Sequence, residues 1–233
     1  MIALKKIGKI LILCLVAVVI FLTAALSLNQ KDEEKEYLQE AQEVSNQPIN
    51  LGYGMRIVEI GAYAGEYVED GSNEFTLDVL ALVVKNEGEE YIQYAEITMP
   101  VGEENANFSV STLTPGSTVV LLEKNRMIYE ERDYTTATVQ NVVIFQEPLS
   151  LCEDQLEVQI LDGALNVKNI SGKSIEDDIT VYYKNYSSDI YYGGITYRVR
   201  VEGGLEKEEI RQIPVAHVSK SGSKLMFVTC GDK

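Results

Sequence analysis

Hydrophobic and polar positions divide the chain into a short N-terminal part with helical character and a long part with strand character. Residues 10–30 carry no charged side chain and consist mainly of Leu, Ile, Val, Ala and Phe. At about 1.5 Å per helical residue, this run would extend about 31 Å, which matches the hydrocarbon core of a bilayer. The pattern predicts a transmembrane helix over residues 10–30, preceded by a short terminus at residues 1–9.

The charges beside this run predict its orientation. Lys5, Lys6 and Lys9 precede it, and an excess of basic residues favours the cytoplasmic side. The rest of the chain is then expected outside the cell membrane, in a single-pass arrangement. A cleaved secretory signal is the alternative, with Ala25-Leu26-Ser27 as a small-x-small cleavage site. The run is longer than the usual apolar region of about 7–15 residues in such signals, which favours a retained anchor.

Residues 31–48 are predicted to form a helical stalk. They are rich in Glu, Lys, Gln, Leu and Ala, which are good helix formers. Tyr37, Leu38, Ala41 and Val44 follow helical spacing. Because the residue before a proline disfavours the helical conformation, Pro48 is expected to end the stalk.

Beyond Pro48, β-branched and aromatic runs alternate with turns rich in Gly, Asn, Asp and Pro. This texture predicts a mainly β fold, with antiparallel β-sandwiches rather than helices packed on a sheet. Pro148 separates two series, so we expect one sandwich at residues 49–147 and another at residues 148–233. The predicted strands are 55–60, 75–85, 91–99, 107–113, 118–123 and 135–146, then 156–160, 164–169, 179–185, 195–202, 209–213 and 225–229.

An internal repeat supports two similar units. The string Leu82-Val83-Val84-Lys85-Asn86 corresponds to Leu165-Asn166-Val167-Lys168-Asn169, at an offset of 83 residues. Each copy reads as a strand, a tight turn and a second strand. A period of this length suits one small sandwich per copy, so the pattern favours a duplication over convergence of two hairpins.

Two segments resemble a known class of domain. The stretch 167–175 with 179–183 in the second unit, and Leu113-Thr114-Pro115-Gly116-Ser117 in the first, are similar to FxLYD-type immunoglobulin-like domains of bacterial envelope proteins. The Phe-x-Leu-Tyr-Asp string itself is absent from both units. The layout also resembles membrane-anchored Gram-positive envelope proteins of uncharacterised function. The resemblance implies tandem immunoglobulin-like sandwiches outside the membrane and brings no catalytic residues.

Net charge narrows the possible partners. The chain has 20 basic and 36 acidic residues, a formal net charge of −16. Without the three N-terminal lysines, 17 basic residues face 36 acidic ones, which gives −19. A field of this sign repels phosphate backbones, so we expect no nucleic-acid partner. It would attract cationic partners.

A cluster of tyrosines is the strongest indication of a partner-binding surface. Six tyrosines fall within 16 residues, among Ser, Asn and Gly, a composition that provides adaptable binding surfaces. Alternation along strands would turn some rings inward and leave others exposed. Tyrosine also suits strands for packing alone. The predicted partner-binding residues are Tyr182, Tyr183, Tyr186, Tyr191, Tyr192 and Tyr197.

Cys152 and Cys230 lie near the two ends of the second predicted sandwich. First and last strands often lie close together, and an exported domain meets oxidising conditions, so a disulfide between them is one expectation. Two unpaired buried thiols are the other.

Catalytic and metal sites are not expected. His217 is the only histidine, which excludes zinc sites built on several histidines. Its neighbours Ser219 and Ser221 are too close along a strand for ordinary triad geometry. The acidic turns at 69–74 and 177–178 lack the spacing of a known calcium loop. We also expect no cofactor.

The sequence thus favours a non-enzymatic binding or accessory role in the cell envelope, with a protein or wall component as partner. A secreted or wall-associated carbohydrate-binding module is the main alternative. The absence of Trp counts against stacking on sugars. The remaining alternative is a small serine hydrolase based on His217.

Overall fold

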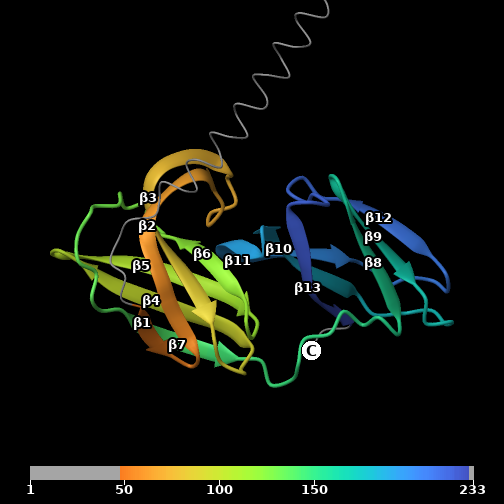
Figure 1. Cartoon of the computed structure of the whole chain (residues 1–233). Helices are drawn as coiled ribbons and strands as arrows, with labels where there is room; N and C mark the ends of the chain where they lie inside the picture. Colours follow the sequence, from red (N-terminus) through yellow and green to blue (C-terminus); the bar gives the residue numbers. More distant parts are fainter. Residues whose placement is uncertain (1–47, 231–233) are drawn as a thin grey trace, which may run out of the picture. The chain divides into compact units, whose positions relative to one another are not determined.

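The chain is mainly β in the computed structural model, which describes residues 48–230 (Figure 1). The predicted transmembrane helix and all but the last residue of the predicted stalk lie outside the described residues. The strands are β1 (Ile49–Gly52), β2 (Met55–Tyr67), β3 (Glu74–Asn86), β4 (Ile92–Val101), β5 (Glu104–Leu113), β6 (Thr118–Leu122), β7 (Thr138–Ile144), β8 (Leu156–Leu161), β9 (Ala164–Asn169), β10 (Ile179–Ser187), β11 (Ile190–Val201), β12 (Ile210–Pro214) and β13 (Ser223–Cys230).

Each predicted strand overlaps one of these elements, and β1 is an additional strand that the sequence pattern does not predict. β2 also continues seven residues beyond the predicted end at Ile60, through a stretch that contains Gly61 and Gly65. Its pairing with β3 continues to Tyr67, opposite Glu74. Pairing to a neighbouring strand therefore outweighs the weak strand preference of these glycines.

The same strand order occurs twice. Strands β2-β3-β6 lie side by side, and so do β8-β9-β12. Likewise, β5-β4-β7 has the order of β11-β10-β13. The N-terminal half, residues 48–147, and the C-terminal half, residues 148–230, thus contain the same two three-stranded groups in the same chain order.

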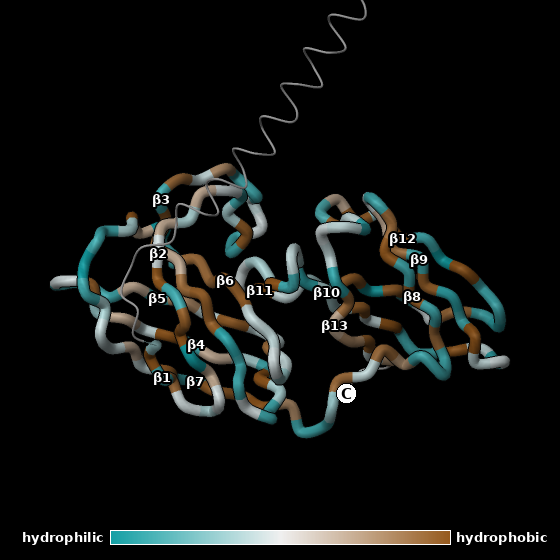
Figure 2. The backbone as a smooth tube through the Cα atoms, in the orientation of Figure 1, coloured by the Kyte–Doolittle hydropathy of each residue, from teal (hydrophilic) through white to brown (hydrophobic). Residues whose placement is uncertain are grey.

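Two main hydrophobic cores follow these halves. In Figure 2 the hydrophobic residues concentrate along the strands, with hydrophilic residues in the turns. The larger core contains fully buried side chains of the N-terminal half such as Leu82, Ile97 and Phe108, and also includes Met226 and Phe227 of β13. The smaller core is built by side chains of the C-terminal half alone.

One strand pair departs from the predicted antiparallel pattern. β6 and β11 pair in parallel, with Val119 opposite Tyr191 and Val120 opposite Tyr192. The two strands belong to different halves, and each is the outermost strand of its own three-stranded group. The pairing joins the two strands into a seven-stranded sheet, and it covers part of each edge.

The internal repeat contains a pair of equivalent buried asparagines. Asn86 ends β3 and Asn169 ends β9, and both are fully buried. Each side-chain amide donates to the carbonyl four residues later, at 2.8 Å in the first copy and 2.7 Å in the second. Each side-chain oxygen accepts from the backbone N–H two residues later. The two asparagines therefore mark equivalent positions in the two halves.

Candidate functional site

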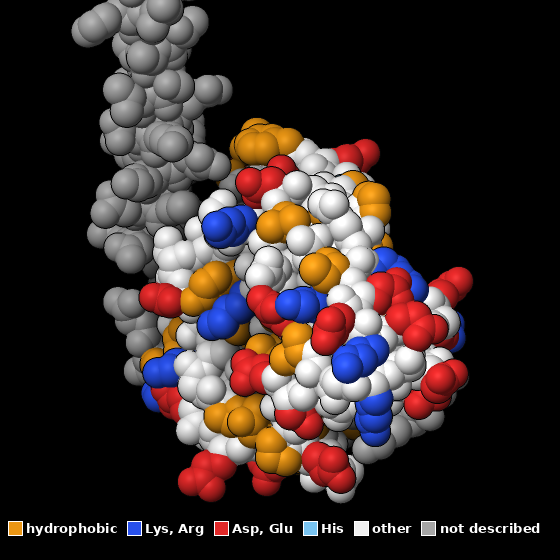
Figure 3. Space-filling view, turned by 90° about the vertical axis from the view of Figure 1, so that its right-hand side faces the viewer, with side chains coloured by type: hydrophobic (Ala, Val, Ile, Leu, Met, Phe, Trp, Pro, Cys, Tyr) orange, Lys and Arg blue, Asp and Glu red, His pale blue; other side chains and the backbone are white. Residues whose placement is uncertain are grey.

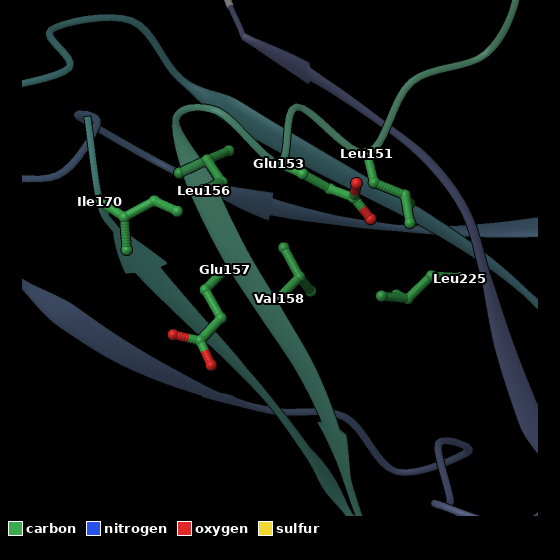
Figure 4. A pocket seen from close by; sticks show the side chains of 7 residues that line it. All are labelled: Leu151, Glu153, Leu156, Glu157, Val158, Ile170 and Leu225. Carbon is green, nitrogen blue, oxygen red and sulfur yellow. The ribbon is translucent and has the colours of Figure 1, made fainter.

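An open groove lies at one side of the C-terminal half, between β8 and β13 (Figure 4). Its volume is about 240 Å³. In the view of Figure 4, Leu156 and Ile170 lie at one end of the groove, Leu151 and Leu225 at the other, and Val158 between them. Glu153 and Glu157 complete the lining. The groove is smaller than the usual range of about 300–1,000 Å³ for small-molecule pockets, so its size suits one or two side chains.

Local chain geometry produces the groove. Cys152 has a positive φ of 53°, and its carbonyl accepts from the backbone N–H groups of Gln155 and Leu156, both at 2.8 Å. This turn starts β8 with Leu156 buried and Glu157 exposed. Alternation then directs Val158 to the same face as Leu156. Val158 stays partly exposed, because β8 is the outer strand of its sheet among residues 48–230.

The two glutamates give the groove a negative rim. The Glu157 carboxylate accepts a hydrogen bond of 2.7 Å from the amide of Gln159, two residues along β8. Neither Glu153 nor Glu157 forms an ion pair with a described lysine or arginine. Acidic side chains are also spread over the face seen in Figure 3, interspersed with a smaller number of basic ones. An apolar floor with two carboxylates that form no ion pair is suited to a segment that carries aliphatic and basic side chains.

The predicted tyrosine cluster is divided between the two hydrophobic cores. Tyr183 and Tyr191 are buried, in the smaller and the larger core respectively. Tyr191 reaches the larger core because β11 pairs with β6 there. These two rings therefore pack inside the molecule and are not accessible to a partner. The sequence could not indicate this, because the parallel β6–β11 pair joins residues more than 70 positions apart.

The other four tyrosines are half-buried and make specific ring contacts. Tyr182 stacks on Phe227 with ring centroids 4.0 Å apart, and Tyr197 stacks on Tyr183 at 5.1 Å. The Lys224 ammonium lies 4.5 Å from the centroid of the Tyr186 ring, a cation–π contact. Tyr192 is half-buried as well, and burial raises its pKa. Partner binding by these four rings stays a prediction.

A buried lysine that the sequence pattern does not reveal lies beside this cluster. Lys184 of β10 is fully buried, and its ammonium donates to three carbonyl oxygens: Ser111 at 2.9 Å, Gly194 at 3.1 Å and Ile195 at 2.9 Å. Burial lowers its pKa to about 7, although the nearby Glu69 carboxylate opposes this shift. Because Ser111 belongs to the N-terminal half, the lysine ties the two halves together.

Glu69 completes this polar junction. Its carboxylate accepts from the backbone N–H of Gly194 at 2.8 Å and from that of Leu122 at 3.1 Å. Burial raises the pKa of Glu69, and the two backbone donors oppose the rise. A Cβ atom at Gly194 would overlap the carbonyl oxygen of Ser109, so only glycine fits between the two halves here. Lys184 and Glu69 bond to backbone groups of both halves, so we interpret the junction as structural.

The two cysteines of the second predicted sandwich meet. Cys152 and Cys230 are free thiols in the structure, and they contact each other. Burial, followed by the neighbouring Cys152 thiol, raises the pKa of Cys230 to about 11. The backbone thus brings the predicted disulfide partners together, and the disulfide itself stays a prediction.

The remaining polar candidates have ordinary surroundings. Asp70 and Glu74 of the first acidic turn pair with Arg126, and Asp178 of the second accepts from Gly203 and Arg200. Within residues 48–230, no group of three or more His, Cys, Asp or Glu side chains is arranged to hold a metal ion. His217 is exposed, and no hydrogen bond joins it to the nearby serines.

The fold and the groove define a mainly β, sandwich-like protein with an acidic, apolar-floored groove at one edge. No family model, curated protein or solved structure matches the chain. The resemblance to FxLYD-type domains therefore stays a prediction. In the described part of the chain, no helix has the length and apolar character needed to cross a bilayer.

Proposed function

We propose that this chain is a single-pass, membrane-anchored protein whose non-enzymatic role is to bind a protein partner in the cell envelope. The apolar groove carries the proposal, together with Glu153 and Glu157, which form no ion pair with a described lysine or arginine. The groove holds one or two aliphatic side chains, and the two carboxylates attract basic ones. The net charge of −16 would raise the association rate of a basic partner.

The proposed location rests on the sequence. The uncharged run at residues 10–30 and the three lysines before it support an anchor with the rest of the chain outside. Two tandem immunoglobulin-like sandwiches, at 49–147 and 148–233, would then form the outer part. The repeated strand order and the equivalent Asn86 and Asn169 support this division.

Binding at the groove can be tested with the full chain in lipid nanodiscs. The probe is a fluorescein-labelled peptide of alternating aliphatic and basic residues, acetyl-Thr-Val-Lys-Ile-Lys-Val-Thr-amide, followed by fluorescence anisotropy. The double variant Glu153→Gln with Glu157→Gln should weaken binding at least about tenfold. Glu103→Gln with Glu104→Gln is the matched control, because these two exposed carboxylates lie on the β4–β5 turn. Equal losses in both variants would mean that only general charge matters.

Location needs a separate experiment. A C-terminal epitope tag on the full chain should be removed when intact cells are treated with an impermeant protease. It should remain protected if the chain is oriented inward. Release of the tagged chain into the medium without protease would indicate a cleaved signal.

A further inference from the structure

The first half contains a strand that the second half lacks. β1 pairs antiparallel with the outer edge of β2, where Ile49 lies opposite Ile57 and Asn50 opposite Arg56. Leu51 of the same strand is buried in the larger core. With β1 in place, Ile57 is only 1% exposed.

The equivalent asparagines give the matching positions in the second half. Met55 pairs with Asn86, and Leu156 pairs with Asn169. Met55 and Leu156 are therefore equivalent, and both are buried. Two residues further along each strand, Ile57 corresponds to Val158. The residues between them, Arg56 and Glu157, correspond as well.

No strand of residues 48–230 occupies the place beside β8 that β1 occupies beside β2. The preceding segment turns away: the Val228 N–H donates to the Ser150 carbonyl at 2.9 Å, so that segment runs along β13 instead. Val158 consequently stays partly exposed, and the groove lies over it. The groove over Val158 thus corresponds to the place beside Ile57, where Ile49 packs against the larger core in the first half.

The backbone of this edge is suited to accept a strand. The Ile170 N–H donates to the Gln155 carbonyl, so Gln155 faces β9, and the Leu156 N–H points the other way, toward Cys152. Alternation along β8 then directs the N–H and C=O groups of Val158 and Ile160 outward. Unpaired groups of this kind are a template for β-strand addition.

We propose that β8 binds an extended segment of the partner protein as an added antiparallel strand, in the position that β1 holds in the first half. An aliphatic residue of the segment fills the groove over Val158. The next residue lies opposite Glu157 and is Lys or Arg, because a basic side chain directly across from this carboxylate forms a favourable cross-strand pair. The proposal deepens the proposed function and rests on it: it specifies how the groove holds its partner and which residue pattern it selects.

Backbone methylation separates this binding mode from simple attraction into the groove. With the full native chain in nanodiscs, three forms of the alternating peptide are compared: unmethylated, N-methylated on the three aliphatic residues, and N-methylated on the two lysines. Only the aliphatic residues direct their N–H groups toward β8. We expect the first and third forms to bind alike and the second to bind at least about tenfold more weakly.

The Val158→Lys variant should lose binding to a similar extent, because it places a charge in the groove. Val143→Lys on β7 is the matched control, since Val143 is an exposed valine on a strand of the first half. Thermal unfolding of both variants shows whether they remain folded. The methylated peptides need no such check, because they are tested on the native chain.

The possible outcomes are distinct. Equal binding of all three peptides, together with loss in the Glu153→Gln/Glu157→Gln variant, would overturn strand addition and leave groove binding in place. No binding of any peptide would overturn both proposals. A dimer of the full chain that Val158→Lys dissociates would identify a second copy as the occupant and overturn the proposal of a separate partner.

Discussion

Replacement of Lys184 by methionine should abolish the rise in the free energy of unfolding that the wild-type lysine causes between pH 7 and pH 9.5. Burial lowers the pKa of Lys184 from 10.5 to about 7 in the folded chain. Between these values the unfolded chain keeps the proton that the folded chain has released. Stability therefore rises with pH through this window, and below pH 7, where both states keep the proton, Lys184 adds no pH dependence.

The size of the effect follows from the shift in pKa. One pKa unit corresponds to about 1.4 kcal/mol, so from pH 7 to pH 9.5 Lys184 should add about 3 kcal/mol to the free energy of unfolding. Methionine has a similar length and no charge, so Lys184→Met should lack this increment. In this variant the three carbonyl oxygens that accept from Lys184 lose that donor. Two of them keep another one: the Ser111 carbonyl still accepts from the Thr196 hydroxyl, and the Gly194 carbonyl from the Ser111 hydroxyl.

The assay is urea unfolding of the full chain in non-ionic detergent, followed by circular dichroism at several values between pH 7 and pH 9.5. The difference between wild type and Lys184→Met is the quantity of interest. Cys230 and the buried tyrosines have raised pKa values and lower the stability at high pH, but they contribute equally to both proteins and cancel. A difference that stays constant across the window would refute the reasoning, since Lys184 would then remain charged in the folded chain.

Three other predictions concern positions that sequence and structure single out together. Asn169→Ala should lower the free energy of unfolding by about 3 kcal/mol, because three backbone carbonyls lose their donor, and Asn86→Ala should act similarly; urea titration measures both. Gly194→Ala should cost at least about 2 kcal/mol in the same assay, because its methyl group would overlap the Ser109 carbonyl. At pH 8, Cys230 should react with iodoacetamide about 100-fold more slowly than an ordinary thiol, given its pKa of about 11, and reaction at the ordinary rate would contradict its burial beside Cys152.

Much of the fold could be predicted because local patterns specify it. Runs of β-branched and aromatic residues bounded by turn residues predicted twelve strands, and each overlaps a strand of the structure. The repeated Val-Lys-Asn string identified the two positions where a buried asparagine organises a turn. β1 was missed because Ile49–Gly52 has only four residues, two of them Asn and Gly, which gives too short a pattern for recognition.

Features that depend on contacts between distant parts of the chain could not be predicted from the sequence pattern. Lys184 stands in a strand where a lysine normally indicates a solvent-facing position, and its three acceptors come from β5 and β11. The groove likewise depends on Val158 and Leu225, which lie on strands far apart in the chain. It also depends on the open edge of β8, beside which no strand of residues 48–230 lies, unlike the edge of β2 that β1 covers.

The parallel β6–β11 pair has a consequence for the order of folding. Val119 and Tyr191 are 72 residues apart, and the larger core also needs Met226 and Phe227 from the far end of the described chain. During synthesis, which starts at the N-terminus, the first half can form its own strand pairs. Its β6 edge stays open until the β10–β11 hairpin has been synthesised. Closing such a long loop is slow compared with local hairpin formation. An incomplete chain would therefore expose both an aggregation-prone strand edge and part of the larger core. Resistance to proteolysis should appear in a single step, late in synthesis, when β10, β11 and β13 have been added.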